Sequence, residues 1–251
     1  MYQFFVDQNQ VGRDFITITG PDVRHIRVLR LKPGEIVRVS SSDGQDYQCS
    51  VAEQTDTFVQ LDILDAGVAG TELANRISLF QALPKGDRME SVIQKSVELG
   101  VYEIIPVSMK YCVVKLDSRK AEAKVRRWQA VAESAAKQSK RSRIPVVHPV
   151  MSFPQAVLRA RQCDCRLVPY ENENGMQPAV QAFRSIKAGD SISVMIGPEG
   201  GFAQEEIAAV REWAQVISLG RRILRTDTAA VTMLSALMLH LETMEELWKH
   251  I

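Results

Sequence analysis

The sequence is poor in several features that would define a class of protein. Its 251 residues include only four cysteines, Cys49, Cys112, Cys163 and Cys165. Scattered cysteines in a chain of this length are typical of free thiols in a reducing cytosol. The close pair, Cys163 and Cys165, lacks a second pair and makes a poor zinc site, so we expect no metal.

Long apolar runs and an excess of one charge are also missing. No run approaches the roughly 20 apolar residues of a membrane span, and the first ten residues lack the basic start and apolar core of a signal peptide. We therefore expect a cytoplasmic protein with no membrane partner. The formal net charge is +1, so any surface for nucleic acid must be a local patch.

Residues 1 to about 70 are rich in strand-forming residues. Turn residues separate four short runs, at 15–18, 36–39, 47–51 and 58–63. This pattern predicts a small barrel or sandwich. A helical interruption carries Arg24, Arg27 and Arg30, and a basic face of this kind suits RNA phosphates. The same charges also fit an ordinary solvated helix surface.

From residue 71 onwards, strands alternate with helices, which predicts a largely parallel α/β sheet. A glycine-containing connector at 65–71 separates the two regions. We therefore expect a first domain over 1–70 and a second over 71–251. Expected strands lie at 77–83, 101–107, 165–170, 190–195 and 215–219. The main helices are expected at 84–99, 118–140, 203–214 and 228–247, and Gly100 is expected to close the first of them.

The longest expected helix begins a basic segment. Between residues 118 and 145, nine lysines and arginines face only two glutamates. In a nearly neutral protein, a segment with this excess of positive charge is a candidate phosphate-binding surface. A solvated helix face is the alternative.

The last helix carries an apolar stripe of Val231, Leu234, Met238, Leu241 and Met244. Such a stripe must be buried, either in the protein's own core or against another subunit.

Two turn motifs follow neighbouring predicted strands. The first is Ile196-Gly197-Pro198-Glu199-Gly200-Gly201-Phe202, and the second runs from Leu219 to Thr228. Glycine lets backbone approach a ligand closely, and ligands collect at the carboxyl ends of strands in open α/β sheets. The first motif matches neither common nucleotide-loop pattern. A plain strand-to-helix turn is the alternative reading.

Six segments in fixed order carry a resemblance to a known family. They are His25-Ile-Arg-Val-Leu-Arg30, Pro84-Lys-Gly-Asp-Arg-Met-Glu90, Gln94-Lys-Ser-Val-Glu-Leu-Gly100, Gln138 with Arg141 to Pro145, Gly197 to Phe202, and Leu219 to Thr228. In these segments the chain resembles the bacterial RsmE-type methyltransferases, which methylate N3 of a uridine in 16S ribosomal RNA and belong to the SPOUT superfamily.

The resemblance implies an α/β C-terminal SPOUT domain with a deep trefoil knot and an N-terminal PUA-like β-barrel that binds RNA. It also implies a homodimer, S-adenosyl-L-methionine as the methyl donor, and the assembled 30S ribosomal subunit as the preferred form of the 16S rRNA substrate.

By position, the resemblance implies a donor pocket lined by three loops, with much of the recognition made by backbone groups. The implied lining residues are Pro169, Tyr170, Glu171, Ile196, Gly197, Pro198, Glu199, Gly200, Gly201, Leu219, Gly220, Ile223, Leu224 and Thr226.

The uridine N3–H must lose its proton before N3 can attack the methyl group, so a base or an environment that favours the anion is needed. We expect Arg225 to stabilise charge on a uracil carbonyl or to hold the flanking phosphate. Asp227 would orient Arg225 or take the proton. The alternative is an Arg–Asp pair that braces the knot.

RNA delivery is expected from basic residues of both domains. Arg24, Arg27 and Arg30 would contact RNA from the barrel, and Lys137, Arg141 and Arg143 would do so from the second domain.

Four residues at three sites depart from the family pattern. Tyr2-Gln3 stand where arginines are usual, Arg221 replaces a common proline, and Asp227 replaces a common glutamate.

The competing functions are a SPOUT enzyme acting on tRNA or a ribose 2′-hydroxyl, and a non-catalytic RNA-binding factor of ribosome assembly.

Overall fold

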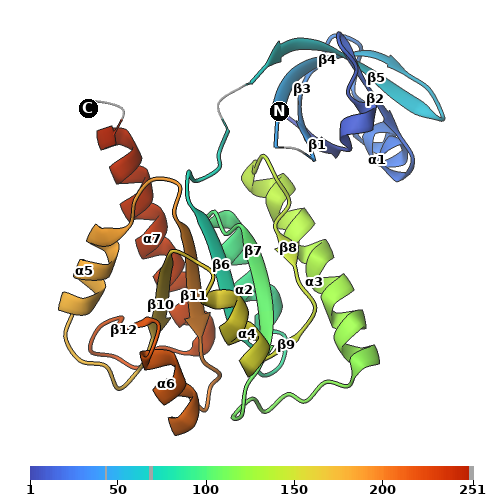
Figure 1. The fold of residues 1–251 in the computed structure, drawn as a ribbon. Helices are drawn as coiled ribbons and strands as arrows, with labels where there is room; N and C mark the ends of the chain where they lie inside the picture. The colour runs from blue at the N-terminus through green and yellow to red at the C-terminus, as the bar shows by residue number, and fades with distance from the viewer. Residues whose placement is uncertain (43, 68–69, 249–251) are drawn as a thin grey trace. The chain divides into compact units, whose positions relative to one another are not determined.

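The computed structural model describes residues 1–42, 44–67 and 70–248 (Figure 1). The chain forms two compact units, residues 1–72 with 136–144, and residues 73–135 with 145–251. The division at residue 72 lies near the expected boundary, but the grouping of 136–144 with the N-terminal unit was not anticipated. Two residues of the expected connector, 68 and 69, lie outside the described residues.

The N-terminal unit is built on a five-stranded sheet that curls on itself, in the order β1-β3-β4-β5-β2 (Figure 1). Its strands are β1 (Gln3–Val6), β2 (Phe15–Thr19), β3 (Ile36–Ser41), β4 (Asp46–Gln54) and β5 (Phe58–Ala66). A 3-10 turn, η1 (Gln8–Gln10), and helix α1 (Pro21–Leu29) complete the N-terminal part. Alternate residues such as Ile16 and Ile18 point into one apolar core. Among the described residues the sheet does not close from β2 to β1, so it is a half-barrel.

Two helix ends in this unit place a basic residue in left-handed backbone. Arg30 caps α1 with φ 51°, and Lys140 follows α3 (Ser118–Ser139) with φ 62°. They are the only non-glycine positions with positive φ in the described part of the chain. The conformation costs a residue with a Cβ about 1–2 kcal/mol. By contrast, α2 (Arg88–Glu98) is followed by Gly100 with φ 87°, as the sequence predicted.

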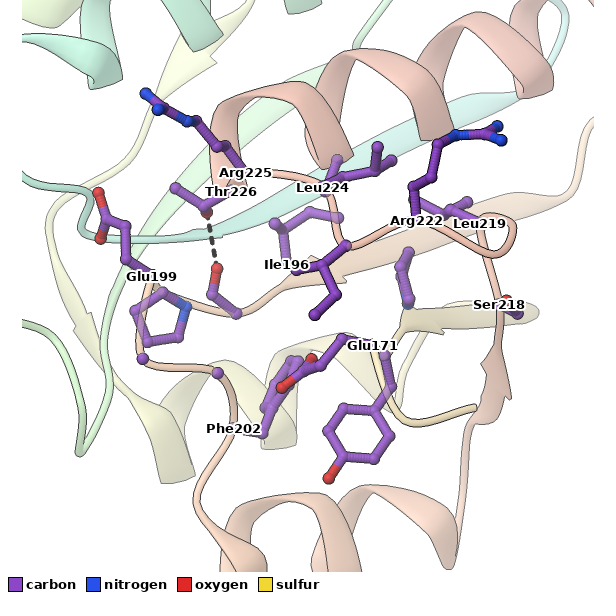
Figure 2. A pocket seen from close by; sticks show the side chains of 18 of the residues that line it. Glu171, Ile196, Glu199, Phe202, Ser218, Leu219, Arg222, Leu224, Arg225 and Thr226 are labelled. Carbon is purple, nitrogen blue, oxygen red and sulfur yellow. Dashed lines mark hydrogen bonds between the residues drawn. The ribbon is translucent and has the colours of Figure 1, made fainter. Parts of the chain in front are cut away.

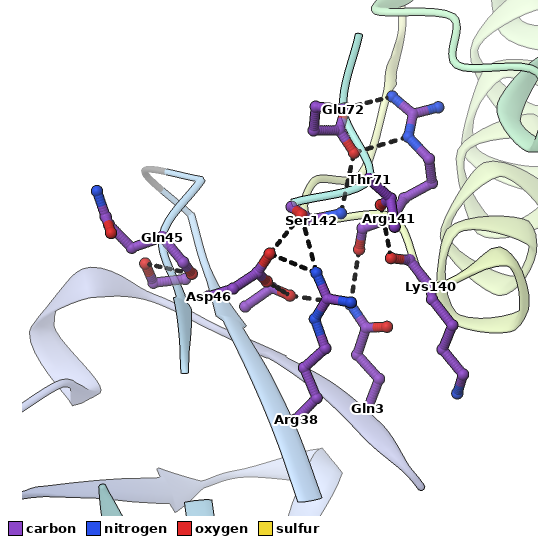
Figure 3. Close-up of polar contacts among 11 residues, drawn as sticks. Gln3, Arg38, Gln45, Asp46, Thr71, Glu72, Lys140, Arg141 and Ser142 are labelled. Carbon is purple, nitrogen blue, oxygen red and sulfur yellow. Dashed lines mark hydrogen bonds and ion pairs between the residues drawn. The ribbon is translucent and has the colours of Figure 1, made fainter. Parts of the chain in front are cut away.

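A buried polar network holds the 136–144 segment within the N-terminal unit (Figure 3). Arg38 pairs with Asp46, and Arg38 also donates to the Ser142 hydroxyl at 3.2 Å. The Ser142 hydroxyl in turn donates to Asp46. Asp46 is 3% exposed, so its charge is compensated by these partners rather than by water. The network therefore fixes where the segment sits on the half-barrel.

The C-terminal unit contains a parallel sheet in the order β12-β10-β11-β6-β7-β8, with β9 also paired to β7. Its strands are β6 (Arg76–Ala82), β7 (Glu103–Ser108), β8 (Val146–Val147), β9 (Met151–Ser152), β10 (Cys165–Pro169), β11 (Ser191–Ile196) and β12 (Gln215–Ile217). The remaining helices are α4 (Phe153–Ala160), α5 (Gln177–Ser185), α6 (Gln204–Arg211) and α7 (Thr226–Trp248). The expected parallel α/β sheet is confirmed.

The buried face of α7 differs from the expected stripe. Leu234 and Leu241 are buried as expected, but Val231, Met238 and Met244 are only half-buried. The other buried apolar residues of the helix, among those whose burial is described, are Ala230, Met233 and Leu237. The helix packs on α2 and β11. Because α7 carries apolar residues on most of its surface, spacing alone did not decide which stripe would be buried.

We expect Asp46→Ala to lower the free energy of unfolding of the protein by about 3–5 kcal/mol, because it leaves the buried Arg38 guanidinium without its counter-charge. Urea unfolding monitored by circular dichroism measures this change. A matched control is Asp56→Ala, which removes an exposed partner of Arg27 at 2.7 Å and should cost less than about 1 kcal/mol. Equal effects from the two variants would contradict the structural role of the network.

Candidate functional site

A cavity of about 410 Å³ lies at the carboxyl edge of the parallel sheet (Figure 2). Its walls are the loops that follow β10, β11 and β12. The two turn motifs were expected after neighbouring strands, but β10 lies between β11 and β12 and pairs with both. Parallel strands end at the same edge, so all three loops meet there.

All fourteen residues implied for a donor pocket line this cavity, and Arg225 lines it as well. The cavity has four further lining residues that were not expected, Phe202, Ser218, Arg222 and Ala229. Each lies inside or next to one of the two turn motifs. Their proximity to those motifs was the only signal in the sequence that marked them.

The 197–202 loop needs its glycines for close packing. A Cβ on Gly201, where φ is 71°, would lie 2.4 Å from the Glu171 carboxylate. One on Gly197 would lie 2.9 Å from the Phe202 ring. The Gly201 N–H also closes a turn onto the Pro198 carbonyl at 2.9 Å. A side chain at either glycine would force the wall of the cavity to move.

The carboxylate of Glu199 links the same loop to the start of α2. It accepts hydrogen bonds from the Lys85 backbone N–H at 2.9 Å and from the Arg88 guanidinium at 3.2 Å. Both partners lie next to the start of α2. The structure thus assigns Glu199 a bracing contact, and the backbone of the loop forms the cavity wall.

Thr226 joins the glycine loop to the first turn of α7 (Figure 2). Its hydroxyl donates to the Gly197 carbonyl at 2.7 Å and accepts from the amide of Gln81 at 2.9 Å. Gln81 is fully buried near the end of β6. Since a hydroxyl has one proton, the donation to Gly197 requires Gln81 to be the donor to Thr226. This relay sets the separation between two walls of the cavity.

Apolar and aromatic side chains line much of the cavity. Tyr170 and Phe202 meet edge to face, with ring centroids 6.3 Å apart. Ile223 is 84% exposed although it lines the cavity. A bound flat ring would cover such a side chain, so the geometry suits a ligand with an aromatic base.

Arg225 and Asp227 occupy different environments. Arg225 is exposed and borders the cavity, whereas Asp227 is half-buried in the first turn of α7 and does not line it. No ion pair joins these two side chains within the described residues.

The predicted RNA contacts lie in one compact unit, because residues 136–144 group with the N-terminal half-barrel. Arg24, Arg27 and Arg30 are exposed, and Lys137 lies 4.0 Å from Asp22 of α1. Arg143 is half-buried.

Arg141 does not fit the expected RNA contact. It is 2% exposed and forms a bidentate ion pair with Glu72. The Arg141 Nε donates to one carboxylate oxygen at 2.7 Å, and its Nη2 donates to the other at 2.6 Å. A guanidinium held in this way is not available to a phosphate, so we assign Arg141 a structural role.

The cysteines and the described helices add no further site. The four thiols are free, and burial raises the pKa of Cys49 to about 12 and that of Cys165 to about 11. Within the described ranges, no cluster of three or more His, Cys, Asp or Glu side chains is placed to hold a metal ion. No helix in those ranges is long and apolar enough to cross a membrane.

Two family models match the chain. Residues 71–238 match an RNA methyltransferase domain, and residues 18–64 match an RNA methyltransferase PUA domain. The PUA-like identity expected for the N-terminal unit is thereby confirmed.

Known proteins resemble the chain over most of its length. The ribosomal RNA small subunit methyltransferase E of Bacillus subtilis is 37% identical over 88% of both proteins. The enzyme of the same name from Neisseria gonorrhoeae, solved bound to S-adenosyl methionine, is 30% identical with a TM-score of 0.79, over 94% of this chain and 96% of that one. A putative methyltransferase from Legionella pneumophila, in complex with the same cofactor, is 29% identical with a TM-score of 0.79, over 95% and 97%.

We expect Thr226→Val to raise the amide hydrogen-exchange rate of Gly201 by roughly ten-fold, because it removes one buried hydrogen bond to the loop that the Gly201 N–H closes. Thr226→Ser retains the hydroxyl and should leave the exchange rate within about two-fold of the parent. Exchange followed by mass spectrometry or NMR measures both variants. Loop protection unchanged in Thr226→Val would show that the relay does not hold the wall.

Proposed function

Because this chain belongs to the ribosomal RNA small subunit methyltransferase E family, we propose that it transfers a methyl group from S-adenosyl-L-methionine to N3 of a uridine in 16S rRNA. The observation that carries this proposal is the three-loop cavity, which contains every residue implied for the donor pocket.

The donor would occupy this cavity with its adenine between the apolar side chains of the 219–224 turn and the aromatic wall. Polar atoms of the base and ribose would bind backbone groups of the three loops, which the glycines allow to approach closely. The loop positions held by Thr226 and Glu199 would then set the direction of the reactive methyl group. Alignment supplies much of the acceleration, since the sulfonium is already reactive.

When bound, the donor would supply an electrophilic methyl group to N3, with its sulfur leaving as a thioether, and the N3 proton would have to leave. Arg225 is placed at the cavity edge, where its charge would stabilise the developing negative charge on a uracil carbonyl. Asp227 makes no ion pair with Arg225 in the described structure. We therefore propose that it takes the proton through a water molecule rather than orienting Arg225 directly.

The proposal extends to the assembly and the place of action. The half-buried Val231 and Met238 and the exposed Leu239 give α7 a second apolar face beside the buried one. That face would pack against a second copy of the chain in a homodimer. The substrate would be the 30S subunit in the cytoplasm. The trefoil knot implied by the family resemblance stays a prediction.

The proposal predicts methyl transfer to 30S subunits isolated from cells that lack the modification. With labelled donor, nucleoside analysis should find the label in 3-methyluridine from 16S rRNA. Label in tRNA or in a ribose 2′-O-methyl group would favour a different SPOUT enzyme. Absence of donor binding in calorimetry would favour the non-catalytic ribosome-assembly factor.

Arg225→Ala should lower kcat on the order of 100-fold at saturating donor and 30S subunit, because it removes a charge from the site where the transition state becomes negative. The dissociation constant for the donor should change little. Arg221→Ala is the matched control, since Arg221 is exposed on the same turn and does not line the cavity. A kcat near that of the parent in Arg225→Ala would exclude the assigned role.

A further inference from the structure

We propose that the end of α1 and the turn after α3 form one phosphate-binding surface on the N-terminal unit, with Arg30 and Lys140 as its principal contacts. The phosphates are those of the 16S rRNA in the proposed function, so the surface depends on that function. It assigns Lys140 a contact that the sequence had assigned to Arg141.

The backbone at these two residues is the first support. Ten glycines in the described chain have positive φ, and the only other residues that do so are Arg30 and Lys140. Both are basic, both stand at a helix C-terminus, and both are exposed. Glycine is the usual residue at such an end. Strained backbone concentrates at functional sites, where a side chain is held against its own preference.

The geometry of the α3 end is the second support. The Arg141 N–H bonds back to the Ala136 carbonyl at 3.0 Å, which requires the left-handed residue between helix and loop to be Lys140. The Lys140 carbonyl accepts from the Thr71 hydroxyl at 2.7 Å, and its ammonium donates to the Met1 carbonyl at 3.0 Å. The first contact holds the Lys140 backbone, and the second holds its ammonium beside the N-terminal strand.

The α3 end and α1 belong to the same unit and lie close together. Lys137, one turn before Lys140, is 4.0 Å from Asp22 in the first turn of α1. From Asp22 to Arg30 the helix rises about 12 Å. Cations thus occur on both elements within a distance that several phosphates of one RNA strand span.

The buried network explains how the turn keeps its position (Figure 3). Arg141 pairs with Glu72, and the Ser142 N–H donates to the same carboxylate at 2.9 Å. Gln3, in a position where arginine is usual, is buried and donates to the Arg141 carbonyl at 2.6 Å. Buried ion pairs generally stabilise a fold less than apolar packing does, and in some proteins they specify one arrangement of the chain. We infer that the required geometry is that of the exposed cations on either side.

A different explanation for the two cations is their favourable interaction with the helix dipole. That interaction requires only a cation near the last turn and does not require left-handed backbone at the cation itself. Glycine substitutions separate the two explanations, because they remove the charge and relieve the backbone strain. If the cations contact phosphates, RNA binding weakens. If the cations only interact with the helix dipole, RNA binding is unchanged.

The test compares the parent with Arg30→Gly and Lys140→Gly in binding to 30S subunits that lack the modification, over a series of KCl concentrations. Each variant should bind about five-fold more weakly, and its slope of log affinity against log salt should be smaller by about 1. Its melting temperature should equal or exceed that of the parent. Lys140→Arg, which keeps the charge, should restore binding.

Lys187→Gln is the matched control. Lys187 is an exposed cation of the C-terminal unit, and its carbonyl bonds to Asn75 near the amino-terminal end of β6, away from the donor cavity. Its binding and salt slope should match the parent.

Two results would overturn the surface in different ways. Glycine variants that bind with the parent's affinity and salt slope, while the parent methylates 30S subunits, would exclude the surface and leave the proposed function intact. A parent that binds donor but neither binds nor methylates 30S subunits would remove the proposed function and the surface with it.

Discussion

The parallel pairing of β12, β10 and β11 is the constraint on which the candidate site depends. Because the three strands run in one direction, their carboxyl ends meet at one edge, and the loops that follow them form one cavity. The residues of these loops come from positions near 170, 200 and 222 of the chain. Thr226 then joins the β11 loop to α7, so the cavity walls are held to each other as well as to the sheet.

The N-terminal unit includes a segment that lies far along the chain from the rest of the unit. Residues 136–144 are tied to the half-barrel by buried charges rather than by a strand pair. Such contacts are directional, because an unpaired buried charge is costly, and they allow one arrangement where apolar packing allows several. The positions of the nearby basic residues follow from that arrangement.

Much of the fold and the site was predictable from particular residues. Runs of strand-forming residues and apolar residues at helical spacing located the parallel strands and the long helices, and the glycine loop at 197–201 marked the cavity. The role of Glu199 was harder to see, because its partners at Lys85 and Arg88 are more than 100 residues away. The buried ion pair of Arg141, which was expected to contact RNA, was hard to see for a similar reason. Its neighbours in sequence are basic, but its partner Glu72 comes from the connector region.

The sequence by itself determined the elements, the glycine loop and the family, because these depend on local backbone preference, apolar spacing and ordered motifs. Only the tertiary structure decided that β10 separates β11 from β12 and that Arg141 is buried while Lys140 is exposed. It also decided that the buried face of α7 keeps Leu234 and Leu241 of the expected stripe but includes Leu237 in place of Val231 and Met238. These outcomes depend on which distant groups satisfy a buried charge or cover an apolar face, and no local pattern encodes that choice.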